Sequence, residues 1–189
     1  ARMKRQAGKR PLPGERPMGD ELQRMIRVDH AGEFGAARIY DGQLAVFGPR
    51  HRVTPIIRKM KEQEQKHLQV FGRLVVEKGA RPTALSPVWN VAGFALGAAT
   101  ALMGEKAAMA CTAAVEEVIN AHYQAQRDKL KAWGVEKDFE KTVGEFQADE
   151  VLHRDTAYAH GAKETPGYRT LSAAIKAGCR AAIWLSTRI

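Results

Sequence analysis

Cysteine is scarce in this sequence, and its scarcity excludes two classes of site. The only cysteines, Cys111 and Cys179, lie far apart in apolar stretches and form no CxxC pair. Disulfide frameworks and thiolate-rich zinc sites need more cysteines at closer spacing. We therefore interpret both as thiols packed in the interior.

The sequence also has little of the alternating β-branched pattern that is typical of strands. Alanine-rich stretches at helical spacing take its place, so the fold class that we expect is all-α. With 189 residues, of which 44% are hydrophobic and 27% are charged, the chain is long enough for one domain with a sizeable core. We predict this domain over residues 20–189, after a flexible basic N-terminal arm over residues 1–19.

Negative charge is in deficit. The 30 Lys and Arg residues outnumber the 21 Asp and Glu residues, which gives a net charge of +9. An excess of this sign suggests an anionic partner. The sequence contains no nucleic-acid recognition motif, and an anionic membrane surface fits the charge equally well at this point.

Charge is absent from residues 82–104. The helical part, residues 88–103, spans roughly 24 Å, which is short of the roughly 30 Å hydrocarbon core of a bilayer. It is therefore not expected to cross a membrane. A helix lying on the bilayer surface and an ordinary core crossover both remain open. A last helix with apolar and basic faces is predicted after Pro166.

The sequence contains a four-residue motif, Glu-x-x-His, twice: at Glu64 and His67, and at Glu150 and His153. On a helix, residues three apart lie on one face, one turn apart. Apolar residues continue each pair at alternating steps of three and four, which places both pairs on the buried seam of a helix bundle. A buried carboxylate usually becomes neutral, finds a partner or binds a metal.

Each motif is preceded by a helix with a single glutamate on its seam, so the chain carries a disguised repeat. These glutamates are Glu33 and Glu116, and each is followed by a tyrosine at seven residues and a glutamine at ten. Such a set is typical of the di-iron and di-manganese carboxylate four-helix bundles. The predicted ligands are Glu33, Glu64, His67, Glu116, Glu150 and His153.

The alternative for these six residues is a set of buried ion pairs between helices. Four carboxylates against two imidazoles would leave excess negative charge in the interior, and two divalent ions would supply the missing positive charge. Carboxylate oxygens with one imidazole for each ion suit iron or manganese.

Four stretches carry a family resemblance: Met25-Ile-Arg-Val-Asp-His-Ala-Gly-Glu33, Trp89–Gly97, Ala110–Glu117 and Ala177–Ile183. Through them the chain, over about residues 22–189, resembles the 5-demethoxyubiquinone hydroxylases of ubiquinone biosynthesis. The resemblance implies a ferritin-like four-helix bundle with two additional apolar membrane-associated helices. Carried over by position, the family's iron ligands fall on the six predicted residues, with Glu64 and Glu150 as bridges. Phe34 stands where the family often has tyrosine.

The activity that the resemblance implies is hydroxylation of the ring of a polyprenyl methoxy-methyl-benzoquinol. The implied cofactors are two Fe ions, with O2 as co-substrate and an external reductant, either NADH or the quinol itself. The implied partners are the quinol, a membrane surface, a lipid-binding protein of the same pathway and a second copy of the chain, without nucleic acid. A lipid substrate favours the membrane interpretation of residues 88–103, together with residues 171–185. The implied location is peripheral, on the matrix side of the mitochondrial inner membrane or the cytoplasmic face of a bacterial one.

Tyr40, His122, Tyr123 and His30 are candidates for contacts with the ligands, or for moving electrons or protons. Hydrogen-bonded polar residues of a helix interior are the alternative for each. Two other functions remain as alternatives, the first of which would use the same six ligands. One is an iron-storage or peroxide-scavenging bundle, and the other is a basic membrane- or nucleic-acid-binding module with a structural metal.

Overall fold

The computed structural model describes residues 17–189. Most of the predicted basic arm lies outside these residues. The first helix begins at Met18, so Met18 and Gly19 belong to this helix and not to the arm.

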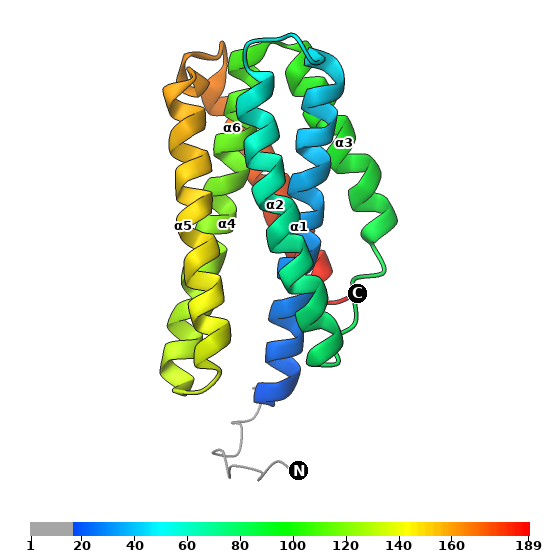
Figure 1. The fold of residues 1–189 in the computed structure, drawn as a ribbon, viewed down its shortest axis with the longest axis vertical. Helices are drawn as coiled ribbons and strands as arrows, with labels where there is room; N and C mark the ends of the chain where they lie inside the picture. The colour runs from blue at the N-terminus through cyan, green and yellow to red at the C-terminus, as the bar shows by residue number, and fades with distance from the viewer. Residues whose placement is uncertain (1–16) are drawn as a thin grey trace.

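The described residues form helices and no strand, which confirms the all-α prediction (Figure 1). The elements are α1 (Met18–Phe47), α2 (Thr54–Glu77), α3 (Ser86–Leu102), α4 (Glu105–Trp133), α5 (Lys137–Ala159), the short 3-10 helix η1 (Ala162–Glu164) and α6 (Tyr168–Ser186). None of the described helices is both long and apolar enough to cross a bilayer.

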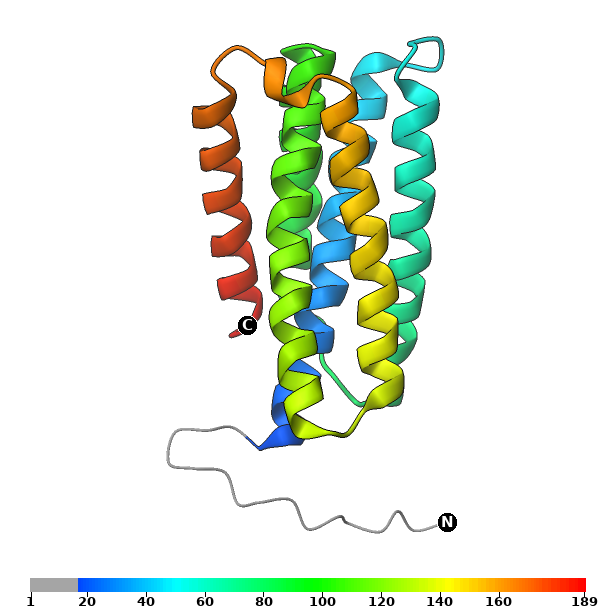
Figure 2. The ribbon, with the colours of Figure 1, turned by 90° about the vertical axis from the view of Figure 1, so that its left-hand side faces the viewer.

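Four long helices, α1, α2, α4 and α5, lie side by side along the long axis of the molecule (Figures 1 and 2). The closest packing within this group is between α1 and α2 and between α4 and α5. Both pairs are helical hairpins with short connections. In the second, Gly134 ends α4 in the left-handed conformation, with φ of 68°, which glycine adopts without strain.

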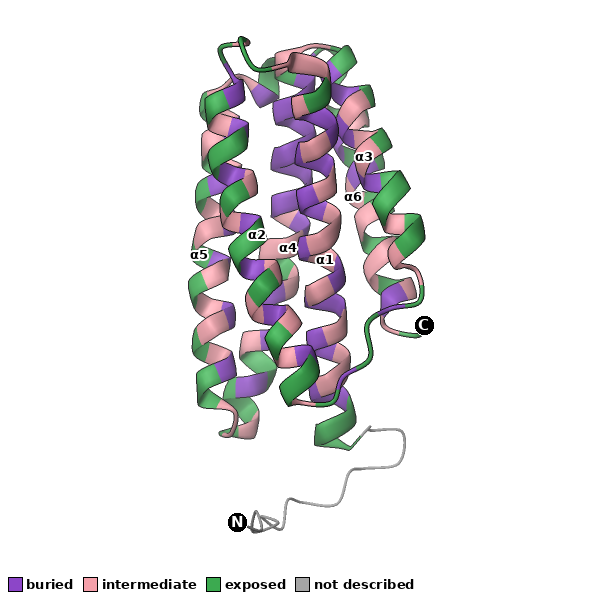
Figure 3. Cartoon of the chain, turned by 45° about the vertical axis from the view of Figure 1, so that its right-hand side comes forward, coloured by how far each residue is buried: buried purple, intermediate pink, exposed green. Residues whose placement is uncertain are grey.

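The remaining two helices lie outside this group of four. Helix α3 is part of the long connection from α2 to α4 and packs along α1, and α6 packs along α4. Figure 2 shows α6 beside α4, on the side away from α5. Helix α4 is therefore covered on several sides, and the run from Ala107 to Glu116 is buried without a break. Figure 3 shows buried residues concentrated on α1 and α4, at the centre of the molecule.

The contact between α1 and α3 depends on glycine. A Cβ atom built on Gly97 of α3 would lie 1.9 Å from the carbonyl oxygen of Ile39, and one on Gly42 of α1 would lie 2.1 Å from that of Phe94. No side chain fits at either position. The two backbones can therefore approach each other only because both residues lack one.

Candidate metal centre

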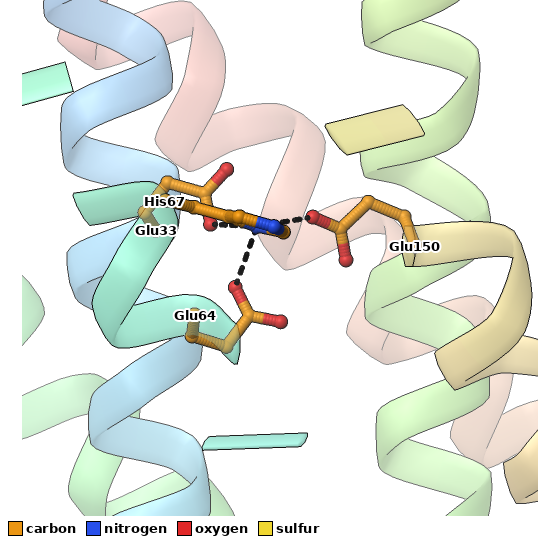
Figure 4. A group of neighbouring side chains, drawn as sticks. All are labelled: Glu33, Glu64, His67 and Glu150. Carbon is orange, nitrogen blue, oxygen red and sulfur yellow. Dashed lines mark ion pairs between the residues drawn. The ribbon is translucent and has the colours of Figure 1, made fainter. Parts of the chain in front are cut away.

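The structure brings together all six residues that the sequence singles out as ligands. Helices α1 and α4 contribute one glutamate each, and α2 and α5 contribute a Glu-x-x-His pair each. Every one of these side chains is almost fully buried. They form two groups whose ligand atoms lie within 4.8 Å of one another: Glu33, Glu64, His67 and Glu150 (Figure 4), and Glu64, Glu116, Glu150 and His153.

Both imidazoles point their Nδ1 atoms into the centre. The Nδ1 atom of His67 lies 3.5 Å from Oε2 of Glu33 and 3.3 Å from Oε1 of Glu150. The Nδ1 atom of His153 lies 3.0 Å from Oε1 of Glu64 and 3.3 Å from Oε2 of Glu150. Glu64 and Glu150 thus belong to both groups and lie between the two imidazoles.

Most of these inward-facing atoms have no hydrogen-bond partner. Both carboxylate oxygens of Glu64 and of Glu150, one oxygen of Glu33 and of Glu116, and Nδ1 of both histidines are buried and unpartnered. Buried polar atoms are nearly always satisfied, so such a cluster requires a group that is able to bind several of them. The donor set fits two divalent cations, whose charge would offset that of the four carboxylates.

In the protein without metal, burial and the neighbouring charges shift the pKa values of the ligand side chains. Burial, together with the charges of Glu150 and Glu33, raises the pKa of Glu64 well above its ordinary value. Burial also raises the pKa of Glu116. For His67, burial lowers the pKa, but the nearby carboxylates of Glu150 and Glu33 outweigh it and raise the pKa to about 10. Protons therefore occupy part of this centre, and a metal ion would displace them.

Tyr40 and Tyr123 contact the cluster in a crossed arrangement. The hydroxyl of Tyr40 on α1 donates to Oε1 of Glu116 on α4, at 2.8 Å, and that of Tyr123 on α4 donates to Glu33 on α1. Each tyrosine follows the glutamate of its own helix by seven residues but binds the glutamate of the other. Burial raises the pKa of both tyrosines well above the ordinary value, so both hydroxyls stay protonated as donors.

The histidines suggested beside these tyrosines do not reach the ligands by a hydrogen bond in the described residues. Nε2 of His122 instead lies 3.3 Å from Oδ1 of Asp29 and 2.9 Å from Nε2 of Gln126. Burial raises the pKa of Asp29, and its contact with His122 opposes that rise. His30 is half-buried, with Nδ1 unpartnered, and burial lowers its pKa.

Sequence reasoning missed two polar residues that contact the outer faces of the imidazoles. Nε2 of His67 lies 3.1 Å from Oδ2 of Asp149, and Nε2 of His153 lies 3.1 Å from Oε1 of Gln63. The amide of Gln63 also donates to Oδ1 of Asp149, at 3.3 Å. A signal was available, because Gln63 and Asp149 each directly precede the glutamate of a Glu-x-x-His motif.

An apolar cavity of about 590 Å³ lies between α1, α3, α4 and α6. Its wall on α1 consists largely of small residues, Ala31, Gly32, Gly35 and Ala36, which flank Glu33 in the sequence. On α4 it reaches Val115, the residue before Glu116. The cavity therefore lies against the same two helices that supply the single glutamates.

Both cysteines are free: Cys111 is buried, as predicted for a packed thiol, whereas Cys179 is only partly buried and lines the cavity. Burial raises the pKa of Cys111 to about 12 and that of Cys179 to about 11. Both thiols therefore stay protonated at neutral pH in the metal-free protein, and neither belongs to the two groups of ligand atoms.

Comparisons with known proteins agree with the motif resemblance. The family model described as ubiquinone biosynthesis protein COQ7 matches residues 20–186. The 3-demethoxyubiquinol 3-hydroxylase of Rhodospirillum rubrum is 51% identical over 178 residues, which cover 94% of this chain and 83% of that protein. The human NADPH-dependent 3-demethoxyubiquinone 3-hydroxylase, mitochondrial, is 51% identical over 89% of this chain and 78% of its own length. The 5-demethoxyubiquinone hydroxylase, mitochondrial, of Saccharomyces cerevisiae is 39% identical over the same shares.

Proposed function

This chain belongs to the ubiquinone biosynthesis protein COQ7 family, and on that premise we propose that it hydroxylates a demethoxyubiquinol ring at a centre of two iron ions. Membership makes it a hydroxylase of ubiquinone biosynthesis. The observation that carries the metal assignment is the cluster of buried, unpartnered carboxylate and imidazole atoms. An iron-storage bundle would use the same ligands, but the family relationship favours the hydroxylase.

In this proposal residues 20–189 act as one ferritin-like domain. One ion would be held by Glu33 and His67 and the other by Glu116 and His153, and Glu64 and Glu150, which belong to both groups, would be shared. The two overlapping groups of ligand atoms support this division. Two reduced iron ions held there would supply two electrons to O2, so that one oxygen atom enters the ring and the other leaves as water with two protons. The tyrosine hydroxyls hold the terminal glutamates Glu33 and Glu116 in place.

The apolar cavity is the proposed site of the quinol. Its volume is in the range of small-molecule sites, and its lining is almost entirely apolar, which suits a polyprenyl chain. Cβ atoms built on Gly32, Gly35 and Gly178 would meet no atom within 4 Å, so these glycines leave open space in the cavity. The small residues on α1 let the ring approach the metal centre closely.

Exposed apolar side chains on α3 and near the end of α6 support peripheral membrane binding. Val91, Leu102, Met103 and Trp184 are between 55% and 76% exposed. We propose that this face rests on the quinone-bearing bilayer, on the matrix side in mitochondria or the cytoplasmic face in bacteria, where the net positive charge favours anionic lipid. A lipid-binding partner or a second copy of the chain could cover the same face. Leu96, which belongs to the same helix, lines the cavity.

Several relatives are named NADPH-dependent, among them the human and mouse proteins. We therefore propose that a reduced nicotinamide nucleotide, NADPH or NADH, supplies the electrons. The quinol itself is the other candidate reductant. Stopped-flow reduction of the iron-loaded protein by each of the three identifies the donor.

The proposed function is tested by measuring iron content and hydroxylation by the same protein. Anaerobically reconstituted protein should hold two irons per chain and convert a demethoxyubiquinol to its hydroxylated product, detected by mass spectrometry. Gly35→Leu should fill the cavity and raise KM for the tailed quinol at unchanged iron content. Gly72→Leu on α2 is the matched control, because Gly72 also has open space around it but lies away from the cavity. One iron or none per chain, or equal kinetics in both variants, contradicts the proposal.

A further inference from the structure

The two halves of the metal centre are related by the repeat, but their outer contacts are not equivalent. Each imidazole has its Nδ1 atom in the centre and its Nε2 atom facing a polar side chain that directly precedes a motif glutamate. For His67 that side chain is a carboxylate, Asp149. For His153 it is a neutral amide, Gln63.

This difference matters once Nδ1 binds a cation. The imidazole is then neutral with its proton on Nε2, so Nε2 donates to the side chain behind it. A carboxylate acceptor makes the imidazole a more basic ligand than an amide acceptor does, and it fixes the ring more strongly. The ion beside His67 is therefore bound by the more basic of the two imidazoles.

A second pair of equivalent positions also has a carboxyl group in the half with Glu33 and a neutral group in the half with Glu116. Four residues before each single glutamate stands an acceptor for the glutamine of the other half: Asp29 on α1 and Thr112 on α4. Nε2 of Gln126 donates to Oδ1 of Asp29, at 2.7 Å, whereas that of Gln43 donates to the carbonyl oxygen of Ala108, at 3.1 Å, and to Oγ1 of Thr112, at 3.4 Å. The half with Glu33 therefore has a carboxyl group where the half with Glu116 has a hydroxyl.

The two imidazoles are also joined through their acceptors. The amide nitrogen of Gln63 donates to Asp149, while its oxygen faces His153. A chain of contacts thus runs from His67 through Asp149 and Gln63 to His153, across the gap between α2 and α5. Gln63 can contact both Asp149 and His153 only with its amide in this one orientation. Asp149 is therefore the acceptor for His67 and also orients Gln63, the acceptor for His153.

We propose that Asp149 and Gln63 are positioning residues that make the two metal positions unequal, with the position of Glu33 and His67 binding a divalent cation more tightly. The inference rests on the proposed two-metal centre. Asp149 acts mainly on the His67 position, and Gln63 acts on the His153 position. Loading of the centre is then ordered, with the first ion beside His67 and the second beside His153.

The test measures Co²⁺ binding to the metal-free full chain by anaerobic calorimetry, with no turnover involved. Glu116→Ala removes a ligand from the His153 position alone, and Glu33→Ala removes one from the His67 position alone. We expect Co²⁺ to bind more tightly to the first variant than to the second. Adding Asp149→Asn should weaken binding roughly 10–100-fold in the Glu116→Ala background and much less in the Glu33→Ala background, where Asp149 acts only through Gln63.

Gln63→Leu should show the opposite preference, with its larger loss in the Glu33→Ala background. Asp155→Asn and Gln65→Leu are matched controls, because both residues are exposed on the same two helices. They should change neither affinity. In the Co²⁺-loaded protein, proton NMR in water should show faster exchange of the His67 Nε2 proton in Asp149→Asn, with that of His153 affected less.

Equal Co²⁺ affinities in the two single-position variants would overturn the inference. So would an equal loss from Asp149→Asn in both backgrounds, because a purely structural role of Asp149 affects both positions alike. These outcomes are distinct from failure of the proposed function, which would appear as an unsubstituted chain that binds no Co²⁺ at all.

Discussion

Substitution of Gly97 by alanine tests whether close contact between α1 and α3 holds the cavity together. The added methyl group would lie 1.9 Å from the carbonyl oxygen of Ile39, whereas Cβ atoms essentially never approach another heavy atom within 3.0 Å. The two helices would have to separate by about 1 Å. Because the obstructing atom belongs to the backbone of α1, no side-chain rotation can relieve the clash.

The expected loss of stability follows from two opposing effects. Overpacking of this kind costs about 1–3 kcal/mol, and the rigid obstacle places Gly97→Ala near the upper end. Alanine is a better helix former than glycine by about 1 kcal/mol, which offsets part of this cost. We expect the free energy of unfolding to fall by about 2 kcal/mol and Tm by about 4–8 °C, in denaturant and thermal unfolding followed by circular dichroism.

Two further variants make the result interpretable. Gly42→Ala creates a clash at the same interface from the other side, 2.1 Å from the carbonyl oxygen of Phe94. The double variant should therefore lose less than the sum of the two, since a single displacement of α3 relieves both clashes. Gly72→Ala, with no atom within 4 Å of the new methyl group, should be neutral or slightly stabilising. Wild-type stability of Gly97→Ala and Gly42→Ala, with unchanged KM for the tailed quinol, would refute the reasoning.

The other predictions concern the metal centre and the exposed face. Glu150→Ala and His153→Ala should reduce hydroxylation to background and keep the helical circular dichroism spectrum, and near wild-type turnover in either would contradict its assignment as a ligand. Because the pKa of His67 is raised from 6.5 to about 10, its charge stabilises the metal-free fold fully below pH 6.5, and this contribution is lost as pH rises through 10. Metal binding must displace that proton, so affinity should rise with pH and calorimetry in buffers of different ionisation enthalpy should detect proton release near pH 7. Val91→Glu and Leu102→Lys should abolish co-sedimentation with anionic liposomes and keep turnover of a short-tailed quinol, whereas equal loss of turnover on short and long tails would show that this face belongs to the core.

The part of the site that lies on the seams of single helices could be predicted from the sequence. Helical spacing alone places Glu64 beside His67 and Glu150 beside His153, and the repeat relates Glu33 to Glu116. The spacing works because each residue faces the bundle axis regardless of how the neighbouring helices are rotated. The all-helical fold follows from the same periodicity.

Features that depend on two helices at once could not be obtained in this way. Gln63 and Asp149 lie one position off the seam, where only the distance between α2 and α5 decides whether they meet an imidazole or solvent. The cavity was missed for a similar reason. Gly32 and Gly35 leave a hollow because they carry no side chain where α3, α4 and α6 border α1, and Leu96 of α3 lines the same hollow.

The crossed tyrosine contacts bear on how the protein folds. The hydrogen bond from Tyr40 to Glu116 joins residues 76 apart in the chain, and the bond from Tyr123 to Glu33 joins residues 90 apart. Contacts of such long range form only after the entropy of closing the intervening chain has been overcome, so they come late in folding. Each hairpin can assemble from local contacts alone, but neither contains a complete ligand set. We therefore expect the hairpins to dock before a stable centre exists, and ions present during folding to accelerate docking only if the transition state already holds both hairpins together.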